Sequence, residues 1–177
     1  MMKQILAIGG LAFAALGASA STYNWGALNA QTDAQTAYVP AGSFSDVYLF
    51  SVAGNNNGVS SVVSLDLSSI FDITNGTYSI WLDNGAAGPN PISDDTQLAS
   101  WTFNGTTGSA SHTISLGAGN YYYMVSGTAD GTGGGTGYAG LYTIAAAVMP
   151  VPEPASVALL LAGLAAIGVR GALRRPR

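Results

Sequence analysis

The sequence has 177 residues, no cysteine, and nine acidic side chains against five basic ones. Because Glu153 is the ninth acidic residue and the basic residues lie near the two ends, positions 21–149 hold eight aspartates, no Lys and no Arg, a formal charge of −8. Such a surface repels phosphate backbones and excludes nucleic-acid binding. The lack of cysteine excludes disulfides, thiol catalysis and cysteine-ligated metals.

Residues 1–20 have the layout of a secretory signal peptide. Lys3 supplies a short basic region, an apolar stretch runs over 5–16, and Ala18-Ser19-Ala20 has the small side chains that a signal peptidase accepts. We expect cleavage after Ala20, so that the mature chain begins at Ser21. The apolar stretch is short for a membrane span and the cleavage pattern follows it directly, which favours a cleaved signal peptide over an anchor.

Residues 21–149 form one predicted domain without helical periodicity. Short runs that alternate between apolar and polar residues are separated by Gly, Asn and Pro turn signals, a pattern typical of an all-β sandwich. Residues 21–37 have poor periodicity and are interpreted as an N-terminal arm. The expected strands cover residues 36–39, 44–53, 59–67, 77–83, 98–103, 112–116, 121–127 and 138–148.

The predicted fold is therefore an antiparallel β-sandwich, jelly-roll-like, between an N-terminal signal peptide and a single C-terminal transmembrane helix. An early Tyr-x-Phe strand, a late Gly-Asn-Tyr-Tyr-Tyr strand and a closing Tyr-x-Gly-x-Tyr strand resemble the pre-peptidase C-terminal type of module. This resemblance implies an accessory or binding domain rather than a catalytic one.

Side-chain alternation predicts which face of each strand is buried. Phe44, Asp46 and Tyr48 share one face of the strand 44–53, and apolar residues on its other face predict a central position in a sheet. In the strand 59–67, the pattern predicts valines and leucines inside and serines outside.

Two turn signals complete the expected topology. Asn75-Gly76 predicts a turn before the strand 77–83. The glycine-rich run 130–137 is expected to join the tyrosine strand 121–127 to the last strand 138–148 as a hairpin.

Residues 150–177 have three parts. The prolines at 150, 152 and 154 hold the chain extended, as a protease cleft requires. The apolar run 155–169 reaches membrane-spanning length if the helix continues to about 173. An arginine cluster over 170–177 follows, at Arg170, Arg174, Arg175 and Arg177, and predicts a cytoplasmic C-terminus with the β-domain outside.

These three parts resemble the PEP-CTERM sorting signal of bacterial exported proteins, with Val151, Pro152, Glu153 and Pro154 as the motif. The resemblance implies processing by an exosortase, an inner-membrane-anchored precursor, and delivery to the cell surface or extracellular matrix. Phe44-Ser45-Asp46-Val47-Tyr48 also resembles the motif of the FxDxF family of PEP-CTERM proteins, with Tyr48 in place of the final Phe. An ordinary strand with inward aromatics is the alternative interpretation.

The residue pattern does not predict an enzyme. His112 is the only histidine and has no identifiable partner, which favours a structural role, and nothing selects a pair of aspartates for acid–base work. No cofactor is predicted. Calcium is the ion that the acidic loops would suit, with Asp94, Asp95 and Asp130 as candidate ligands, but none of these loops matches a known calcium-loop pattern.

The expected role is structural or adhesive, within an exopolysaccharide or biofilm matrix. The alternative is a carbohydrate-binding or calcium-dependent binding module, and Trp25, Trp81 and Trp101 are the aromatic side chains available to stack on sugar rings. The expected partners are signal peptidase, an exosortase, exopolysaccharide and, before processing, the inner membrane.

Overall fold

The computed structural model describes residues 18–67, 69–85, 94–105, 110–151 and 159–165. Nine strands and one 3-10 turn form in these residues. Each expected strand is present, the one at 112–116 with the expected bounds and the others at shifted bounds. They are β1 (Thr22–Ala27), β2 (Asp33–Val39), β3 (Gly42–Val52), β4 (Asn56–Ser64), β5 (Ile73–Leu82), β6 (Thr96–Thr102), β7 (His112–Leu116), β8 (Gly119–Ala129), η1 (Gly133–Gly135) and β9 (Gly140–Pro150).

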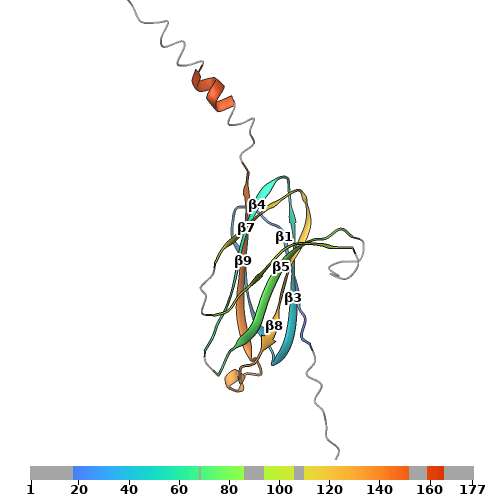
Figure 1. The fold of residues 1–177 in the computed structure, drawn as a ribbon, viewed down its shortest axis with the longest axis vertical. Helices are drawn as coiled ribbons and strands as arrows, with labels where there is room; N and C mark the ends of the chain where they lie inside the picture. The colour runs from blue at the N-terminus through green and yellow to red at the C-terminus, as the bar shows by residue number, and fades with distance from the viewer. Residues whose placement is uncertain (1–17, 68, 86–93, 106–109, 152–158, 166–177) are drawn as a thin grey trace, which may run out of the picture.

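The strands form two layers (Figure 1). One sheet has five strands in the order β1-β3-β8-β5-β6, and the other has four in the order β2-β9-β4-β7. β2 pairs with β9, β3 with β8, β4 with β7 and β5 with β6, so β2 to β9 form one long antiparallel hairpin that is rolled up. This nesting is the strand order of a jelly roll.

β1 departs from the expected antiparallel arrangement. It runs parallel to β3, with Thr22 beside Val47 and Gly26 beside Phe50. The prediction of a wholly antiparallel sandwich is therefore wrong at this pair. The reason is topological. The chain leaves β1, forms β2 in the other sheet, and returns to β3 in the direction of β1. β2 is therefore the crossover connection that two parallel strands need.

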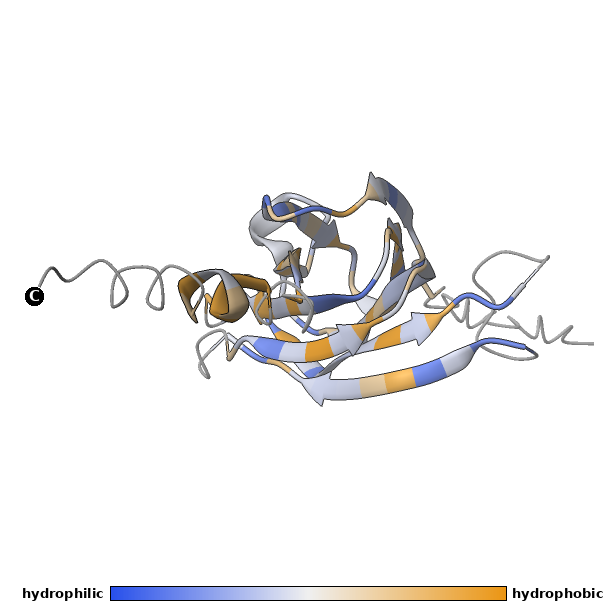
Figure 2. Ribbon diagram, turned by 90° about the horizontal axis from the view of Figure 1, so that it is seen from above, coloured by the Kyte–Doolittle hydropathy of each residue, from blue (hydrophilic) through white to orange (hydrophobic). Residues whose placement is uncertain are grey.

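The core between the sheets is rich in tyrosine. Hydrophobic and hydrophilic residues alternate along the strands (Figure 2), as expected when one face of each sheet is buried. Phe44, Asp46 and Tyr48 all point inward from β3, which lies between β1 and β8, so the predicted central strand is confirmed. The large side chains that are fully buried between the sheets include Tyr48, Tyr78, Tyr123 and Tyr142.

The predicted faces of β4 are inverted. Ser60, Val62 and Ser64 are buried, whereas Val59 and Val63 are half-buried on the outer face. Tyrosine rings from the opposite sheet occupy the space above this strand, and Tyr78 Oη reaches within 3.5 Å of the Ser60 carbonyl oxygen. Small serines leave room for these rings, so volume decides the buried face here rather than hydropathy.

The Asn75-Gly76 turn is a β-bulge inside β5. The pairing of β5 with β8 shifts between Thr74 and Thr77, and Asn75 has a φ of 53°. A Cβ at Gly76 would lie 2.7 Å from the carbonyl oxygen of Phe103, so only glycine fits beside β6 at this position.

The predicted hairpin between the last two strands is also wrong. β8 belongs to the five-stranded sheet and β9 to the four-stranded sheet, so they do not pair with each other. The connection contains η1, and its glycines at 133, 134, 135 and 137 adopt positive φ. The glycine-rich run therefore carries the chain across from one sheet to the other.

The C-terminal segment is described only over 159–165, which are helical and carry exposed leucines. Within the described residues, no helix has the length and apolar character needed to cross a membrane. Most of the predicted transmembrane helix at about 155–173, and the arginine cluster at 170–177, lie outside the described residues.

Candidate functional site

An aromatic hollow lies at the open edge of the sandwich. β6 is the edge strand of one sheet and β7 the edge strand of the other, and they bring Trp101 and His112 together. The two rings stack with centroids 4.7 Å apart and planes 24° apart. Ser100, Trp101, Thr102 and His112 line an open hollow of about 370 Å³. We call these four residues the edge hollow.

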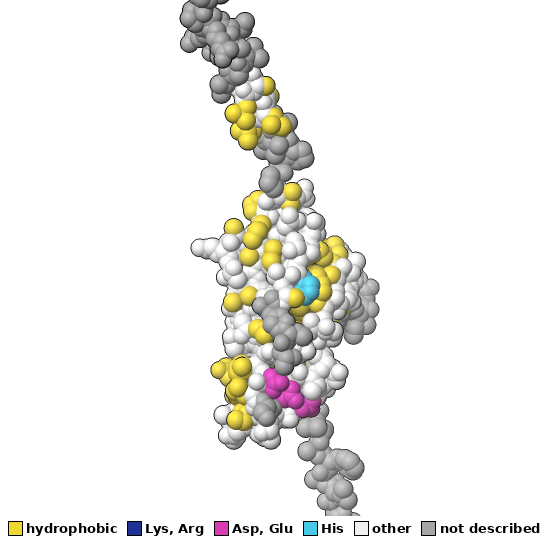
Figure 3. Space-filling view, turned by 60° about the vertical axis from the view of Figure 1, so that its left-hand side comes forward, with side chains coloured by type: hydrophobic (Ala, Val, Ile, Leu, Met, Phe, Trp, Pro, Cys, Tyr) yellow, Lys and Arg dark blue, Asp and Glu magenta, His cyan; other side chains and the backbone are white. Residues whose placement is uncertain are grey.

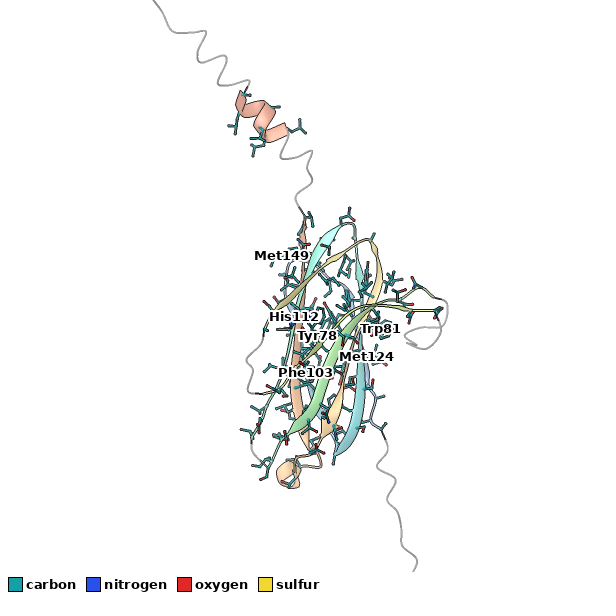
Figure 4. The ribbon with its side chains drawn as sticks, in the orientation of Figure 1. Tyr78, Trp81, Phe103, His112, Met124 and Met149 are labelled. Atoms are coloured by element: carbon teal, nitrogen blue, oxygen red, sulfur yellow. The ribbon has the colours of Figure 1, made fainter. Side chains whose placement is uncertain are left out.

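The rings of the edge hollow rest on Tyr78 of β5. Tyr78 Oη and His112 Nδ1 lie 2.6 Å apart and share a hydrogen bond, and the Tyr78 ring packs against Trp101 at 4.9 Å. Burial raises the pKa of Tyr78 and keeps its hydroxyl neutral. Figure 4 shows Tyr78 and His112 close together near the middle of the domain, with Phe103 beside them.

His112 thus has a partner that the sequence does not indicate, because Tyr78 lies 34 residues away. The histidine reaches the surface beside hydrophobic side chains (Figure 3, cyan). No carboxylate in the described residues lines the hollow. The hydrogen bond with Tyr78 fixes the orientation of the imidazole ring, and the structural role of His112 stays a prediction.

The three tryptophans occupy three different environments. Trp25 packs on Tyr48 at the core, with ring centroids 5.1 Å apart. Trp81 lies on the outer face of the five-stranded sheet, where it stacks parallel to Tyr122 and donates a hydrogen bond to Ser79 Oγ. Trp101 lines the edge hollow between the two edge strands, so the three indoles lie apart and do not form one stacking platform.

The structure brings two of the three calcium candidates together. Asn84 donates from its backbone N to Asp95 Oδ1 at 3.1 Å and from its side chain to the Asp94 carbonyl at 2.8 Å. Asp130 follows the far end of β8, where it accepts a hydrogen bond from Thr74. In the described part of the chain, no group of three or more His, Cys, Asp or Glu side chains is placed to hold a metal ion.

Asp95 has a role at the sheet surface that sequence reasoning missed. Tyr122 Oη donates a hydrogen bond to Asp95 Oδ2 at 2.9 Å. Burial raises the pKa of Tyr122, and the carboxylates of Asp95, Asp83 and Asp94 raise it further. Asp95 is therefore tied to the outer face of β8.

A second polar cluster lies in the core between the sheets. Tyr142 of β9 donates to Asp46 Oδ2 at 2.6 Å, and its hydroxyl is 2.7 Å from that of Tyr48. Ser21 N donates to Asp46 Oδ1 at 2.8 Å, and Phe44 stacks on the Tyr142 ring. Burial raises the pKa of Asp46, although the hydrogen bonds from Tyr142 and Ser21 lower it in part. We call Asp46, Tyr48 and Tyr142 the core triad.

The Phe-x-Asp-x-Tyr run therefore has a structural role. Its side chains Phe44, Asp46 and Tyr48 all contact Tyr142, which belongs to the opposite sheet. Membership of the FxDxF family stays a prediction.

The described residues that adjoin the two predicted processing sites lie at opposite ends of the domain (Figure 1). Ala18, Ala20 and Ser21 are exposed beside the start of β3, where Ser19 makes backbone hydrogen bonds to Ser43 and Ser45. β9 ends at Pro150, at the other end. Val151 is exposed, whereas Pro152, Glu153 and Pro154 lie outside the described residues.

Comparison with protein families gives one match: residues 150–175 match the PEP-CTERM protein-sorting motif. The resemblance predicted from Val151 to Pro154, the apolar run and the arginine cluster is thereby confirmed. The motif indicates an exported protein that is sorted to the cell surface, with an exosortase as its processing partner. No curated protein sequence matches the chain significantly.

Several solved structures are similar at low identity. The pre-peptidase C-terminal domain of collagenase from Bacillus anthracis has 17% identity and a TM-score of 0.42, covering 72% of this chain and 94% of that one. PliG from Aeromonas hydrophila, a periplasmic inhibitor of g-type lysozyme, has 11% identity and a TM-score of 0.44, with coverage of 75% and 100%. CorA, a surface-associated copper-binding protein of Methylomicrobium album BG8, has 11% identity and a TM-score of 0.40, with coverage of 73% and 100%. Likenesses this weak carry no argument about fold or ligand, and the resemblance to pre-peptidase C-terminal modules stays a prediction.

Proposed function

We propose that this PEP-CTERM sorting-motif protein is a non-catalytic component of the cell surface or extracellular matrix. It is exported through its signal peptide, processed by an exosortase, and acts in a structural or adhesive role among exopolysaccharides. The match of residues 150–175 to the sorting motif carries this proposal, since this motif marks exported proteins that are sorted to the cell surface.

The chemistry of the domain supports an extracellular structural role. Residues 21–149 carry eight aspartates and no cation, so copies of the domain repel one another and stay soluble at high density. The domain is held together by buried aromatic packing and by the core triad, which need no disulfide or reducing environment.

The intact mass of the exported protein tests the proposed export and processing. Protein recovered from the medium and envelope of a host should begin at Ser21 and lack the residues after the Pro-Glu-Pro region, and the same host without its exosortase should retain 155–177. Glu153→Gln should block this processing, whereas the matched control Met149→Ala, just before the matched region, should not. Retention of 155–177 in the inner membrane of the unmodified host would contradict the sorting proposal.

A second candidate function, carbohydrate binding, is favoured by the edge hollow. A sugar ring presents an apolar face that stacks on an indole and a hydroxyl rim that needs hydrogen-bond partners. Trp101 offers the ring, and Ser100, Thr102 and His112 offer the polar groups around it. Because the domain has no cation, we expect a neutral saccharide rather than an acidic one as the ligand.

Affinity measurement on exopolysaccharide from the host tests this candidate. Trp101→Ala should weaken binding about tenfold or more, as loss of a stacked aromatic does at other interfaces. Trp81→Ala removes an indole from the outer sheet face and should leave the affinity unchanged. Equal affinity of the Trp101→Ala variant and the unmodified protein would exclude the edge hollow as the site.

A further inference from the structure

The backbone nitrogen of Ser21 has an unusual partner. It donates a hydrogen bond at 2.8 Å to Oδ1 of Asp46, a carboxylate whose residue is only 1% exposed. Ser21 is also the residue at which the mature chain is predicted to begin. The atom that contacts the buried carboxylate is therefore the atom that signal peptidase would convert into an amine.

Among the residues that the structure describes, no Lys or Arg lies near the carboxylate of Asp46. Its other described partner is the neutral hydroxyl of Tyr142, which is bonded in turn to Tyr48. Residues 21–149 contain no Lys or Arg that could move in to compensate the charge. A buried carboxylate held only by neutral donors is costly, which agrees with the raised pKa of Asp46.

Signal peptidase would supply the missing charge. Hydrolysis of the Ala20–Ser21 peptide bond consumes one water and leaves a carboxylate on Ala20 and an ammonium on Ser21. We propose that the new α-ammonium of Ser21 forms an ion pair with the buried Asp46, so that cleavage locks the N-terminus onto β3 and stabilises the mature domain. The inference rests on the proposed export and on cleavage after Ala20.

Cleavage also removes backbone hydrogen bonds that stabilise the precursor, and the ion pair offsets this loss. The precursor has two backbone hydrogen bonds between Ser19 and β3, from Ser19 N to the Ser43 carbonyl and from Ser45 N to the Ser19 carbonyl. Both are lost with the signal peptide. The Ser21 carbonyl still accepts from Val47 N, which keeps the new terminus in place beside Asp46.

The pH dependence of the ion pair follows from the groups around it. Asp46 faces Tyr142 from β9, Tyr48 lies behind Tyr142, and Tyr23 of β1 stacks on Tyr48. Burial raises the pKa values of Tyr48 and Tyr142 and keeps both hydroxyls neutral, so the charges next to Tyr142 are those of the ammonium and the carboxylate. Pairing raises the pKa of the amine above its ordinary range of about 7.7–8.0. While Asp46 is ionised, the stabilisation is therefore present below that range, and it is lost as the pH rises through the raised pKa of the amine.

The sequence allows the Ser21 amine to be modified selectively. Lys3 is the only lysine, so a chain that begins at Ser21 has one primary amine. The experiment measures the rate of acetylation of the exported, mature protein against pH, which gives the pKa of this amine, and then the melting temperature before and after acetylation. We expect a pKa above 8 and a fall in melting temperature of about 5 °C on acetylation.

Two variants serve as controls. A threonine inserted between Ala20 and Ser21 keeps the Ser21 amide on Asp46 and moves the charge one residue outward, so its amine should have an ordinary pKa and its acetylation should leave the melting temperature unchanged. Asp46→Asn should restore an ordinary pKa at Ser21. If Asp46→Asn does not fold, the insertion variant still tests the ion pair, because it leaves the core intact.

The outcomes separate this inference from the function that it rests on. A mature mass that begins elsewhere than Ser21 would overturn both the predicted cleavage and the ion pair. A chain that begins at Ser21 with an ordinary amine pKa, and with no change on acetylation, would overturn the ion pair alone.

Discussion

The core triad and the edge hollow use the same chemistry in two different settings. In each, a tyrosine hydroxyl bonds a polar side chain from the opposite sheet: Tyr142 bonds Asp46, and Tyr78 bonds His112. The triad lies between β3 and β9, where all three side chains are buried, whereas Trp101 and His112 lie between two edge strands and are partly exposed.

The difference teaches that strand position, more than residue type, separates structure from function in this domain. A polar group enclosed between central strands must be satisfied internally and becomes part of the stability of the fold. The same kind of group at an open edge exchanges with solvent, so it is available to a ligand. Each prediction below changes one of these two regions relative to the other.

The largest expected effect is alkaline unfolding driven by the enclosed tyrosines. Burial raises the pKa of Tyr123 to about 12, and the pKa values of Tyr48 and Tyr142 are raised further. A tyrosine whose pKa is raised by folding stabilises the folded domain fully at pH values below its unfolded pKa of 10.0. This stabilisation is lost as the pH rises through the pKa of the folded state. Stability should therefore fall above pH 10 by about 1.4 kcal/mol per pH unit for each enclosed tyrosine.

Denaturant unfolding measured between pH 8 and about pH 12 checks this, with tyrosinate absorbance recorded in parallel. Tyrosinate from the enclosed residues should appear together with loss of structure. Ionisation of all nine tyrosines in a domain that stays folded would contradict the account of the core.

The next largest effect comes from a comparison of the Tyr142 hydroxyl in the core triad with the Tyr78 hydroxyl beside the edge hollow. Tyr142→Phe removes the donor to Asp46 and leaves a buried carboxylate and the Tyr48 hydroxyl short of a partner, which should cost about 3 kcal/mol of unfolding free energy. Tyr78→Phe is the matched change at the edge, where water can bond to His112, and should cost about 1 kcal/mol. Equal costs in urea unfolding would contradict the distinction between an enclosed and an open region.

The smallest effect is expected at the rim of the edge hollow. His112→Ala removes a half-exposed ring, and solvent can bond to Tyr78 in its place, so the unfolding free energy should change by about 1 kcal/mol or less. The measurement is the same urea titration, combined with affinity for host exopolysaccharide. A loss of stability as large as that of Tyr142→Phe would show that His112 belongs to the core.

Strong alternation of large side chains was enough to predict β3. Phe44, Asp46 and Tyr48 share a face in the sequence and are buried together in the structure. Alternation failed in β4, since Ser60 and Ser64 face the tyrosine rings, whereas Val59 and Val63 face outward. β1 was missed because only Tyr23 and Trp25 of this short strand pack on the core, and because it joins the sheet by parallel pairing with a strand that follows it in the chain.

Long-range partners could not be predicted from this sequence. The glycine-rich run before Tyr138 resembles a hairpin connection, yet it crosses between the sheets, because each of β8 and β9 finds two other strands to pair with. The partners Tyr142 of Asp46 and Tyr78 of His112 lie 96 and 34 residues away. The sorting motif was predictable because its residues are adjacent and need no fold to be recognised.

The most direct test of an open edge that binds ligand is an NMR titration of the mature protein with oligosaccharides from the exopolysaccharide of its host. The three indole N–H signals report separately on the core, the outer sheet face and the edge hollow. The account predicts that the Trp101 signal shifts in a saturable way, while the signals of Trp25 and Trp81 stay in place. Saturable shifts at Trp81, or no shift at any of the three, would contradict it.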